Sequence, residues 1–162
     1  GRVGENAAIG RMNESGFRRG PFAVTEAMNR FAADLIARYR IKVAGPRARA
    51  ATMSGGNKQK LVVARELSRG TPLIIAENPT WGVDIGAIEF IHGELLKMRD
   101  AGHAILLISS ELDEIMALSD RIVVMYGGRI SGQMDRADAD RERIGAFMLS
   151  HGEDASAGAA AA

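Results

Sequence analysis

The sequence predicts an α/β fold in which parallel strands are flanked by helices. Two apolar runs of strand length, "LIIAE" at residues 73–77 and "HAILLIS" at residues 103–109, alternate with segments of helical periodicity. Strands that are apolar on both faces are typical of a parallel sheet covered by helices on each side. With 162 residues, 46% of them hydrophobic, the chain can bury a core of its own.

Residues 1–50 are predicted to form a mostly helical segment. Within residues 22–39 the apolar residues recur at helical spacing, at Phe22, Met28, Phe31, Leu35 and Ile36. The run "GPRARA" at residues 45–50 then breaks the pattern. A further helix is expected over residues 58–69, because "GTP" follows it as a stop signal.

The rest of the chain is predicted to be an α/β core, residues 51–150, followed by a disordered tail, residues 151–162. Its helix between the two strands should place one apolar face inward, formed by Ile88, Ile91, Leu95 and Met98. A short helix is expected in "ELDEIMALS", then a β-hairpin around Gly127-Gly128, and a helix over residues 138–149. The tail has little apolar surface to bury.

Composition excludes several classes of function. The chain has 21 Lys+Arg against 20 Asp+Glu, a net charge of +1, which argues against a nucleic-acid surface built on bulk charge. The absence of cysteine excludes disulfides and thiolate metal sites. The three histidines lack the spacing of metal ligands, so no metal site is predicted from them. No apolar run approaches the ~18 residues that cross a bilayer.

The stretch "MSGGNKQK", residues 53–60, has the composition of an anion-binding helix start. Backbone N–H groups in a first helical turn have no intrahelical partner, and the helix dipole is positive there, which suits a phosphate. Glycines would let the phosphate approach the backbone, and Ser54 adds a hydroxyl. Taken alone, the same letters also fit a turn with an ordinary serine N-cap.

Four stretches occur in an order that resembles the ATP-binding cassette of ABC transporters, a P-loop NTPase fold. They are "MSGGNKQK", similar to the signature loop, "LIIAENPT", similar to the Walker B strand, "WGVD", similar to the D-loop, and "LLISSEL", similar to the switch region. The resemblance covers about residues 3–150 and includes neither a Walker A loop nor a Q-loop. The "NKQK" ending and "ELDEIMALSDRI" are most similar to the second of two fused cassettes in bacterial importers of simple sugars or nucleosides.

The resemblance implies a nucleotide-binding role for the signature residues Ser54, Gly55, Gly56, Asn57 and Gln59. A helix N-terminus contributes about 0.3–1 kcal/mol, whereas millimolar affinity needs about 4 kcal/mol, so these residues cannot hold a nucleotide alone. In such cassettes the signature closes over ATP already bound by the opposing cassette. By the same resemblance Asp84 would lie at the dimer interface; otherwise it is an acidic residue at a helix start.

Three positions that the family uses for catalysis are degenerate in this chain. Glu77 stands where a Mg²⁺-binding Asp is usual, Asn78 where a Glu positions the attacking water, and Ser110 where the switch His is usual. Asn78 cannot take a proton, and general-base catalysis is worth about 10²- to 10⁴-fold. The chain is therefore not expected to hydrolyse ATP alone. The resemblance implies ATP and Mg²⁺ as cofactors of a complete, asymmetric cassette dimer.

The implied partners are an N-terminal cassette of the same transporter, integral membrane permease subunits and, indirectly, a periplasmic or lipid-anchored substrate-binding protein. No nucleic acid partner is expected, and the implied location is cytoplasmic, peripheral on the inner face of the cell membrane. Two alternatives remain open. One is a soluble ABC ATPase that acts on nucleic acid or ribosomes, and the other is a non-catalytic α/β interaction domain.

Overall fold

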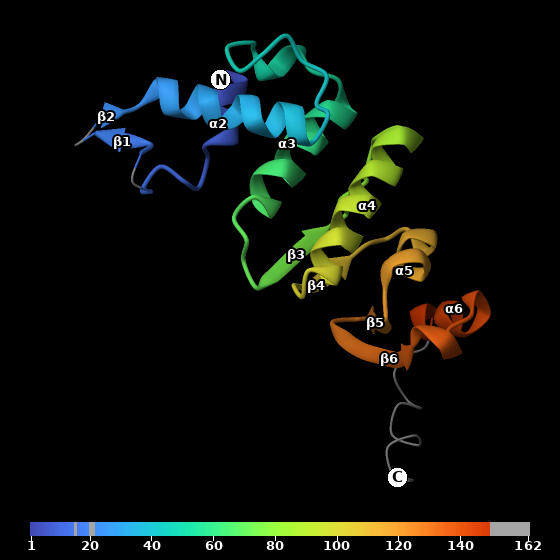
Figure 1. The fold of residues 1–162 in the computed structure, drawn as a ribbon. Helices are drawn as coiled ribbons and strands as arrows, with labels where there is room; N and C mark the ends of the chain where they lie inside the picture. The colour runs from blue at the N-terminus through green and yellow to red at the C-terminus, as the bar shows by residue number, and fades with distance from the viewer. Residues whose placement is uncertain (15, 20–21, 150–162) are drawn as a thin grey trace. The chain divides into compact units, whose positions relative to one another are not determined.

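The computed structural model describes residues 1–14, 16–19 and 22–149 of the chain (Figure 1). It divides into two compact units, Gly1–Leu106 and a second that begins at Leu107, and each is described by itself. The tail predicted over residues 151–162 lies outside the described residues. The proposed boundary at residue 50 stays a prediction. Within the described residues, no helix combines the length and the apolar character that crossing a bilayer requires.

Three helices pack together in the first unit: α1 (Val3–Ala7), α2 (Thr25–Arg38) and α3 (Gly55–Leu67). Each turns its apolar face inward, and the buried side chains are those of Val3, Ala7, Met28, Ala32, Leu35, Leu61, Ala64 and Leu67. The 3-10 helix η1 (Ala50–Thr52) leads into α3. The helix predicted within residues 22–39 is thus confirmed as α2. Met28 and Leu35 of its predicted inward face are buried, whereas Phe31 and Ile36 are half-buried.

The prediction that this apolar face begins at Phe22 is wrong. Phe22 lies in β2 (Phe22–Ala23), which pairs antiparallel with β1 (Arg18–Arg19) ahead of the helix. Its side chain is 75% exposed. Helix α2 starts only at Thr25, so Phe22 lies before the helix although its spacing to Met28 fits the helical period.

A strand–helix–strand arrangement follows: β3 (Leu73–Glu77), α4 (Ile85–Asp100) and β4 (Ala104–Ile108). The division between the two units falls within β4, after Leu106. The two strands are hydrogen-bonded neighbours in a parallel sheet, as expected when a helix connects them. Helix α4 buries Ala87, Ile91 and Leu95, whereas the predicted members Ile88 and Met98 are only half-buried. Helix α3 packs against α4.

The expectation that both faces of the strands are covered is not met by the described residues. Ile74 is buried, but Leu73 and Ile75 on the other face of β3 are 52% and 63% exposed. Leu106 of β4 is 50% exposed as well. Because side chains alternate between the two faces of a strand, the described helices cover one face of β3 and leave the other bare.

The second unit contains α5 (Leu112–Leu118), β5 (Arg121–Tyr126), β6 (Arg129–Asp135), the 3-10 helix η2 (Arg136–Asp138) and α6 (Arg141–Leu149). Strands β5 and β6 form the predicted antiparallel hairpin. Gly127 and Gly128 make its two-residue turn, at φ values of +55° and +78° that favour glycine. The core of this unit consists of Ile122, Val124, Met134, Ala139 and Ile144.

Candidate functional site

The start of helix α3 is fixed by the serine that precedes it. Ser54 has extended backbone angles, and its Oγ accepts a hydrogen bond from the N–H of Asn57 at 3.4 Å, which makes it the N-cap. The side-chain amide of Asn57 also donates to Ser54 Oγ, at 2.8 Å. The helix therefore begins three residues earlier than predicted, at Gly55. We call Ser54–Gly56 the α3 tip.

The α3 tip presents backbone donors at the surface. Ser54 and Gly55 are exposed, while Gly56 is buried beneath them. Helix geometry leaves the N–H groups of Gly55 and Gly56 without an intrahelical acceptor, and the contacts of these described residues supply no other. Together with the positive end of the α3 dipole, this arrangement is suited to an anion.

Two other predicted nucleotide contacts use their side chains within the fold. Besides contacting Ser54, Asn57 accepts a hydrogen bond from the Lys42 N–H through Oδ1, at 2.7 Å. Gln59 donates from Nε2 to the carbonyl oxygen of Pro79, at 2.8 Å. Of the predicted signature residues, only Ser54 and Gly55 are therefore exposed without such a tie.

Pro79 belongs to residues 77–84, which begin at the last residue of β3 and end at the N-cap of α4. We call them the 77–84 segment. It carries Glu77, exposed at the end of the strand, and Asn78, whose φ of +43° is unusual for a residue other than glycine. The N–H of Trp81 donates to the Asn78 carbonyl at 3.1 Å and closes a turn. Thr80 is buried, whereas Trp81 is 80% exposed.

The last residue of the 77–84 segment lies directly against the α3 tip. Asp84 is the N-cap of α4, and its Oδ1 accepts a hydrogen bond from the Ala87 N–H at 2.9 Å. Its other oxygen, Oδ2, would lie 2.9 Å from a Cβ placed on Gly56. The backbone oxygen of Gly82 would lie 3.5 Å from a Cβ on Gly55. The structure thus brings the tip and the segment together.

Ser110, the third predicted catalytic position, belongs to the second unit. It is exposed in the short connection between β4 and α5. Next to it, Ser109 Oγ accepts a hydrogen bond from the Glu111 N–H at 3.0 Å, which orders the start of α5. Its role at an ATP site stays a prediction.

Sequence reasoning missed the partners that hold the site together. The Pro79 carbonyl and the close approach of Asp84 to Gly56 involve residues far apart in the chain, and no local pattern predicts them. The available sequence signal was the Asn78-Pro79 dipeptide after the strand, because Asn-Pro favours the start of a turn.

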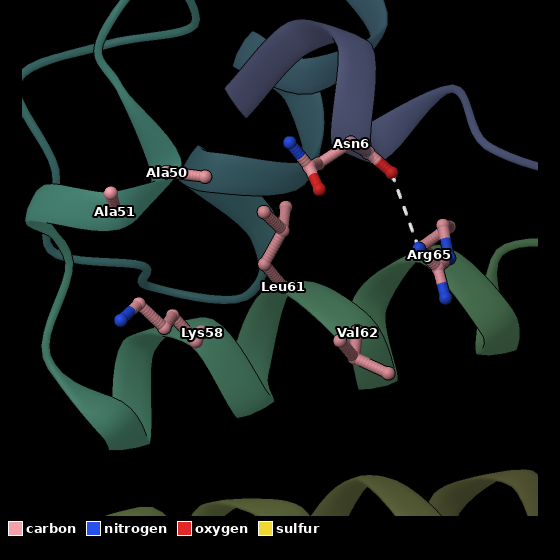
Figure 2. Close-up of a pocket in the computed structure, with 7 residues that line it drawn as sticks. All are labelled: Asn6, Ala50, Ala51, Lys58, Leu61, Val62 and Arg65. Atoms are coloured by element: carbon pink, nitrogen blue, oxygen red, sulfur yellow. Dashed lines mark hydrogen bonds between the residues drawn. The ribbon is translucent and has the colours of Figure 1, made fainter. Parts of the chain in front are cut away.

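A pocket of about 280 Å³ lies on another side of α3, between that helix, α1 and η1 (Figure 2). Leu61 and Val62 line it, and the Arg65 guanidinium spans it to donate to the Asn6 carbonyl at 3.4 Å. Lys58 of the signature-like stretch, residues 53–60, also lines this pocket, but none of the five predicted nucleotide-binding residues does. The candidate site is therefore the exposed α3 tip with the 77–84 segment.

The described residues contain no cluster of three or more metal-ligating side chains. Glu77 places an exposed carboxylate at the carboxyl end of β3. Mg²⁺ keeps several waters and is often bound by one or two carboxylates together with substrate phosphates. A single exposed carboxylate fits that mode of binding, with the remaining ligands supplied by water and a nucleotide.

Comparison with known proteins finds import ATP-binding proteins among the relatives of this chain. The chain is 38% identical over 147 residues to the nucleoside import ATP-binding protein NupA of Lactococcus lactis, a match that covers 91% of this chain and 29% of that protein. It is 44% identical over 121 residues to the guanosine import ATP-binding protein NupO of Bacillus subtilis, covering 75% and 24%. It is also 44% identical over 110 residues to the ribose import ATP-binding protein RbsA of Bacillus subtilis, covering 68% and 22%. The chain thus spans less than a third of the length of these relatives. No protein-family model matches it.

Solved structures with a similar fold are ATP-binding cassettes. A dimeric cassette in a post-hydrolysis state, bound to ADP and Pi, matches with a TM-score of 0.66 at 21% identity, over 83% of this chain and 56% of that one. A nucleotide-free cassette from an ABC transporter matches with a TM-score of 0.67 at 21% identity, over 93% and 60%. At this identity the likeness concerns the fold alone.

Proposed function

Because this chain is a relative of import ATP-binding proteins and has the fold of an ABC ATPase cassette, we propose that it is part of the ATP-binding component of an ABC importer for a simple sugar or nucleoside. Its role is to supply the α3 tip to a composite ATP site in a pair of cassettes. The observation that carries this proposal is the α3 tip, where Ser54 and Gly55 are exposed and the N–H groups of Gly55 and Gly56 have no backbone acceptor, as a site for a terminal phosphate requires.

The tip acts on a nucleotide that another cassette already holds. Its contribution of about 0.3–1 kcal/mol, or ~2 kcal/mol when partly buried, is too small to bind ATP alone. The same energy is enough to favour a closed pair of cassettes when the Walker A loop of the other cassette already binds the phosphate. Ser54 stays fixed as the N-cap, so the donors are oriented before the ligand arrives.

The chain's own catalytic positions favour holding a nucleotide over hydrolysing it. The Glu77 carboxylate would bind Mg²⁺ through water, and the ion would neutralise phosphate charge when bound. Asn78 carries an amide at the position of the general base and cannot accept the proton of an attacking water. We infer that turnover in the pair occurs mainly at the site which this α3 tip completes.

The partners follow from this assignment: an N-terminal cassette of the same transporter, permease subunits in the membrane, and a substrate-binding protein that acts through them. The chain would then lie on the cytoplasmic face of the membrane. The relatives are named for nucleosides, guanosine and ribose, so the proposed cargo is a small sugar or nucleoside.

The proposal is tested with two substitutions that both keep the helix cap. Asp and Asn are both good N-caps, so Ser54→Asp and Ser54→Asn should preserve stability within about 0.5 kcal/mol. Only Ser54→Asp places a negative charge where the phosphate would approach. We expect it to abolish association with a Walker A-containing cassette in the presence of Mg²⁺ and a non-hydrolysable ATP analogue. Ser54→Asn should retain most of this association.

Sedimentation velocity with and without the analogue measures that association. Association of the wild-type chain that is independent of nucleotide, or equal loss in the two variants, would contradict the composite site. In that case the non-catalytic interaction domain becomes the better description.

A further inference from the structure

We propose that Gln59 is a positioning residue, which ties the α3 tip to the 77–84 segment so that a phosphate bound at the tip changes the placement of Glu77 and Asn78. This inference rests on the proposed function for its consequence, but the tie itself can be tested without any nucleotide. It gives Gln59 a role that acts through the protein backbone.

The first observation is the hydrogen bond itself. Gln59 Nε2 lies 2.8 Å from the Pro79 carbonyl oxygen, in a partly buried position. Pro79 stands one residue after Asn78, and the turn there is closed by the Trp81 N–H on the Asn78 carbonyl, at 3.1 Å. The Gln59 amide therefore holds the turn that places Asn78 and Glu77.

The second observation is a contact at the far end of the same segment. Gly56 packs against Asp84 so closely that a Cβ would lie 2.9 Å from Oδ2, and 3.2 Å from the Ala87 Cβ. Asp84 is itself held by its cap on α4. The 77–84 segment thus contacts the first turns of α3 at two points. It is hydrogen-bonded to Gln59 at Pro79 and packs against Gly56 at Asp84.

Because of these two contacts, the α3 tip and the 77–84 segment are expected to move together. A phosphate that draws the Gly55 and Gly56 N–H groups toward itself would shift the first turn of α3, and Gln59 lies on the next turn of that helix. The shift would reach Asn78 through the Pro79 carbonyl. By linkage, a ligand at Glu77 would change the affinity of the tip by the same factor.

The experiment replaces Gln59 with a residue of the same size that titrates. In Gln59→Glu the carboxylate cannot donate to the Pro79 carbonyl at pH 7, whereas a protonated Glu, with an ordinary pKa of about 4.3, can do so. Lys58→Gln is the matched control, since it makes the same change of one negative charge at the exposed neighbouring residue. Amide hydrogen exchange of residues 80–84 is measured in the 162-residue chain, relative to wild type at each pH.

We expect the protection of these amides in Gln59→Glu to fall about fivefold to tenfold at pH 7, the effect of one neutral hydrogen bond, and to recover toward wild type at pH 4. Lys58→Gln should leave it unchanged at both pH values. Unchanged protection in Gln59→Glu overturns the proposal. Equal loss at both pH values also overturns it, because the side chain would then act only by filling space.

A second measurement separates the tie from the proposed function. With a Walker A-containing cassette and the ATP analogue, Gln59→Glu should weaken association severalfold at pH 7, while Lys58→Gln should not. If the wild-type chain fails to associate, the proposed function is contradicted. The hydrogen-exchange result then still tests whether Gln59 holds the 77–84 segment. Normal association in a Gln59→Glu chain that has lost protection overturns the coupling.

Discussion

Gly56 and Asp84 approach so closely that the smallest side chain does not fit between them. A Cβ on Gly56 would lie 2.9 Å from Asp84 Oδ2, and the other carboxylate oxygen is engaged in capping α4. Rotation of the Asp84 side chain away from a new methyl group would therefore break that cap. The glycine that is proposed to let the backbone approach a phosphate also leaves room for helix α4.

We accordingly expect Gly56→Ala to destabilise the chain by about 1–3 kcal/mol through overpacking and partial loss of the cap. The matched control is Gly93→Ala in the middle of α4, where nothing lies within 4 Å of the new Cβ. That change should stabilise the chain by about 0.5–1 kcal/mol, because alanine is the better helix former. Urea unfolding followed by circular dichroism measures both. An unchanged free energy of unfolding in Gly56→Ala would show that Gly56 and Asp84 are not tightly packed.

Asn78 is expected to resist replacement by the family's usual glutamate. Its φ of +43° lies in the left-handed region, which asparagine tolerates and which costs most other residues about 1–2 kcal/mol. Asn78→Glu should lower the free energy of unfolding by about 1 kcal/mol relative to Asn78→Gly. Thermal unfolding of the two variants gives the comparison. Equal stability would mean that the turn relaxes to accept glutamate.

Stability should fall at alkaline pH because of Tyr39. Burial raises the pKa of its phenol above the ordinary value of 10.0, and the neighbouring Arg38 offsets only part of that effect. Above about pH 10 the unfolded state loses a proton that the folded state keeps, so the free energy of unfolding decreases as pH rises. Below about pH 10 the phenol is protonated in both states, and its full contribution to the free energy of unfolding is present.

The measurement is urea unfolding between pH 8 and pH 11, in wild type and in Tyr39→Phe. The variant should lose the part of the alkaline slope that the Tyr39 phenol causes. An unchanged slope in Tyr39→Phe would assign the alkaline effect to other groups.

Trp81 offers a direct reading of the proposed interface. It is the only tryptophan of the chain, is 80% exposed, and lies next to Gly82, whose backbone oxygen faces Gly55. Closure of a cassette over the α3 tip should shield it, shift its emission to shorter wavelength and reduce acrylamide quenching about twofold or more. Ser54→Asp should abolish the change. A tryptophan-free partner cassette is required, and unaltered emission on association would place the interface elsewhere.

Much of the fold was predictable because its signals are local. Gly127-Gly128 marks the hairpin turn, which follows from the backbone preference of glycine. Helix α3 was expected as well, although it starts at Gly55, three residues before the predicted start. The β1–β2 pair was missed, because two-residue strands leave no periodic pattern. Phe22 matched a helical spacing only by coincidence, one turn before the helix starts.

The arrangement of the candidate site was harder to predict. The Ser54 cap follows from its sequence, but the hydrogen bond of Gln59 to Pro79 joins residues twenty positions apart through a backbone carbonyl, which any residue could supply. The left-handed angle of Asn78 likewise depends on the turn that closes on Trp81. Such features arise from tertiary packing, and sequence periodicity carries no record of them.

The bare face of β3, with Leu73 and Ile75 open to water, affects how every one of these measurements has to be made. Apolar surface of this kind promotes self-association, and sulfate or phosphate buffers strengthen it. Preparations should therefore be dilute and low in such salts. The tendency of chains to cluster before any nucleotide is added has to be recorded first, as the baseline from which pairing is measured.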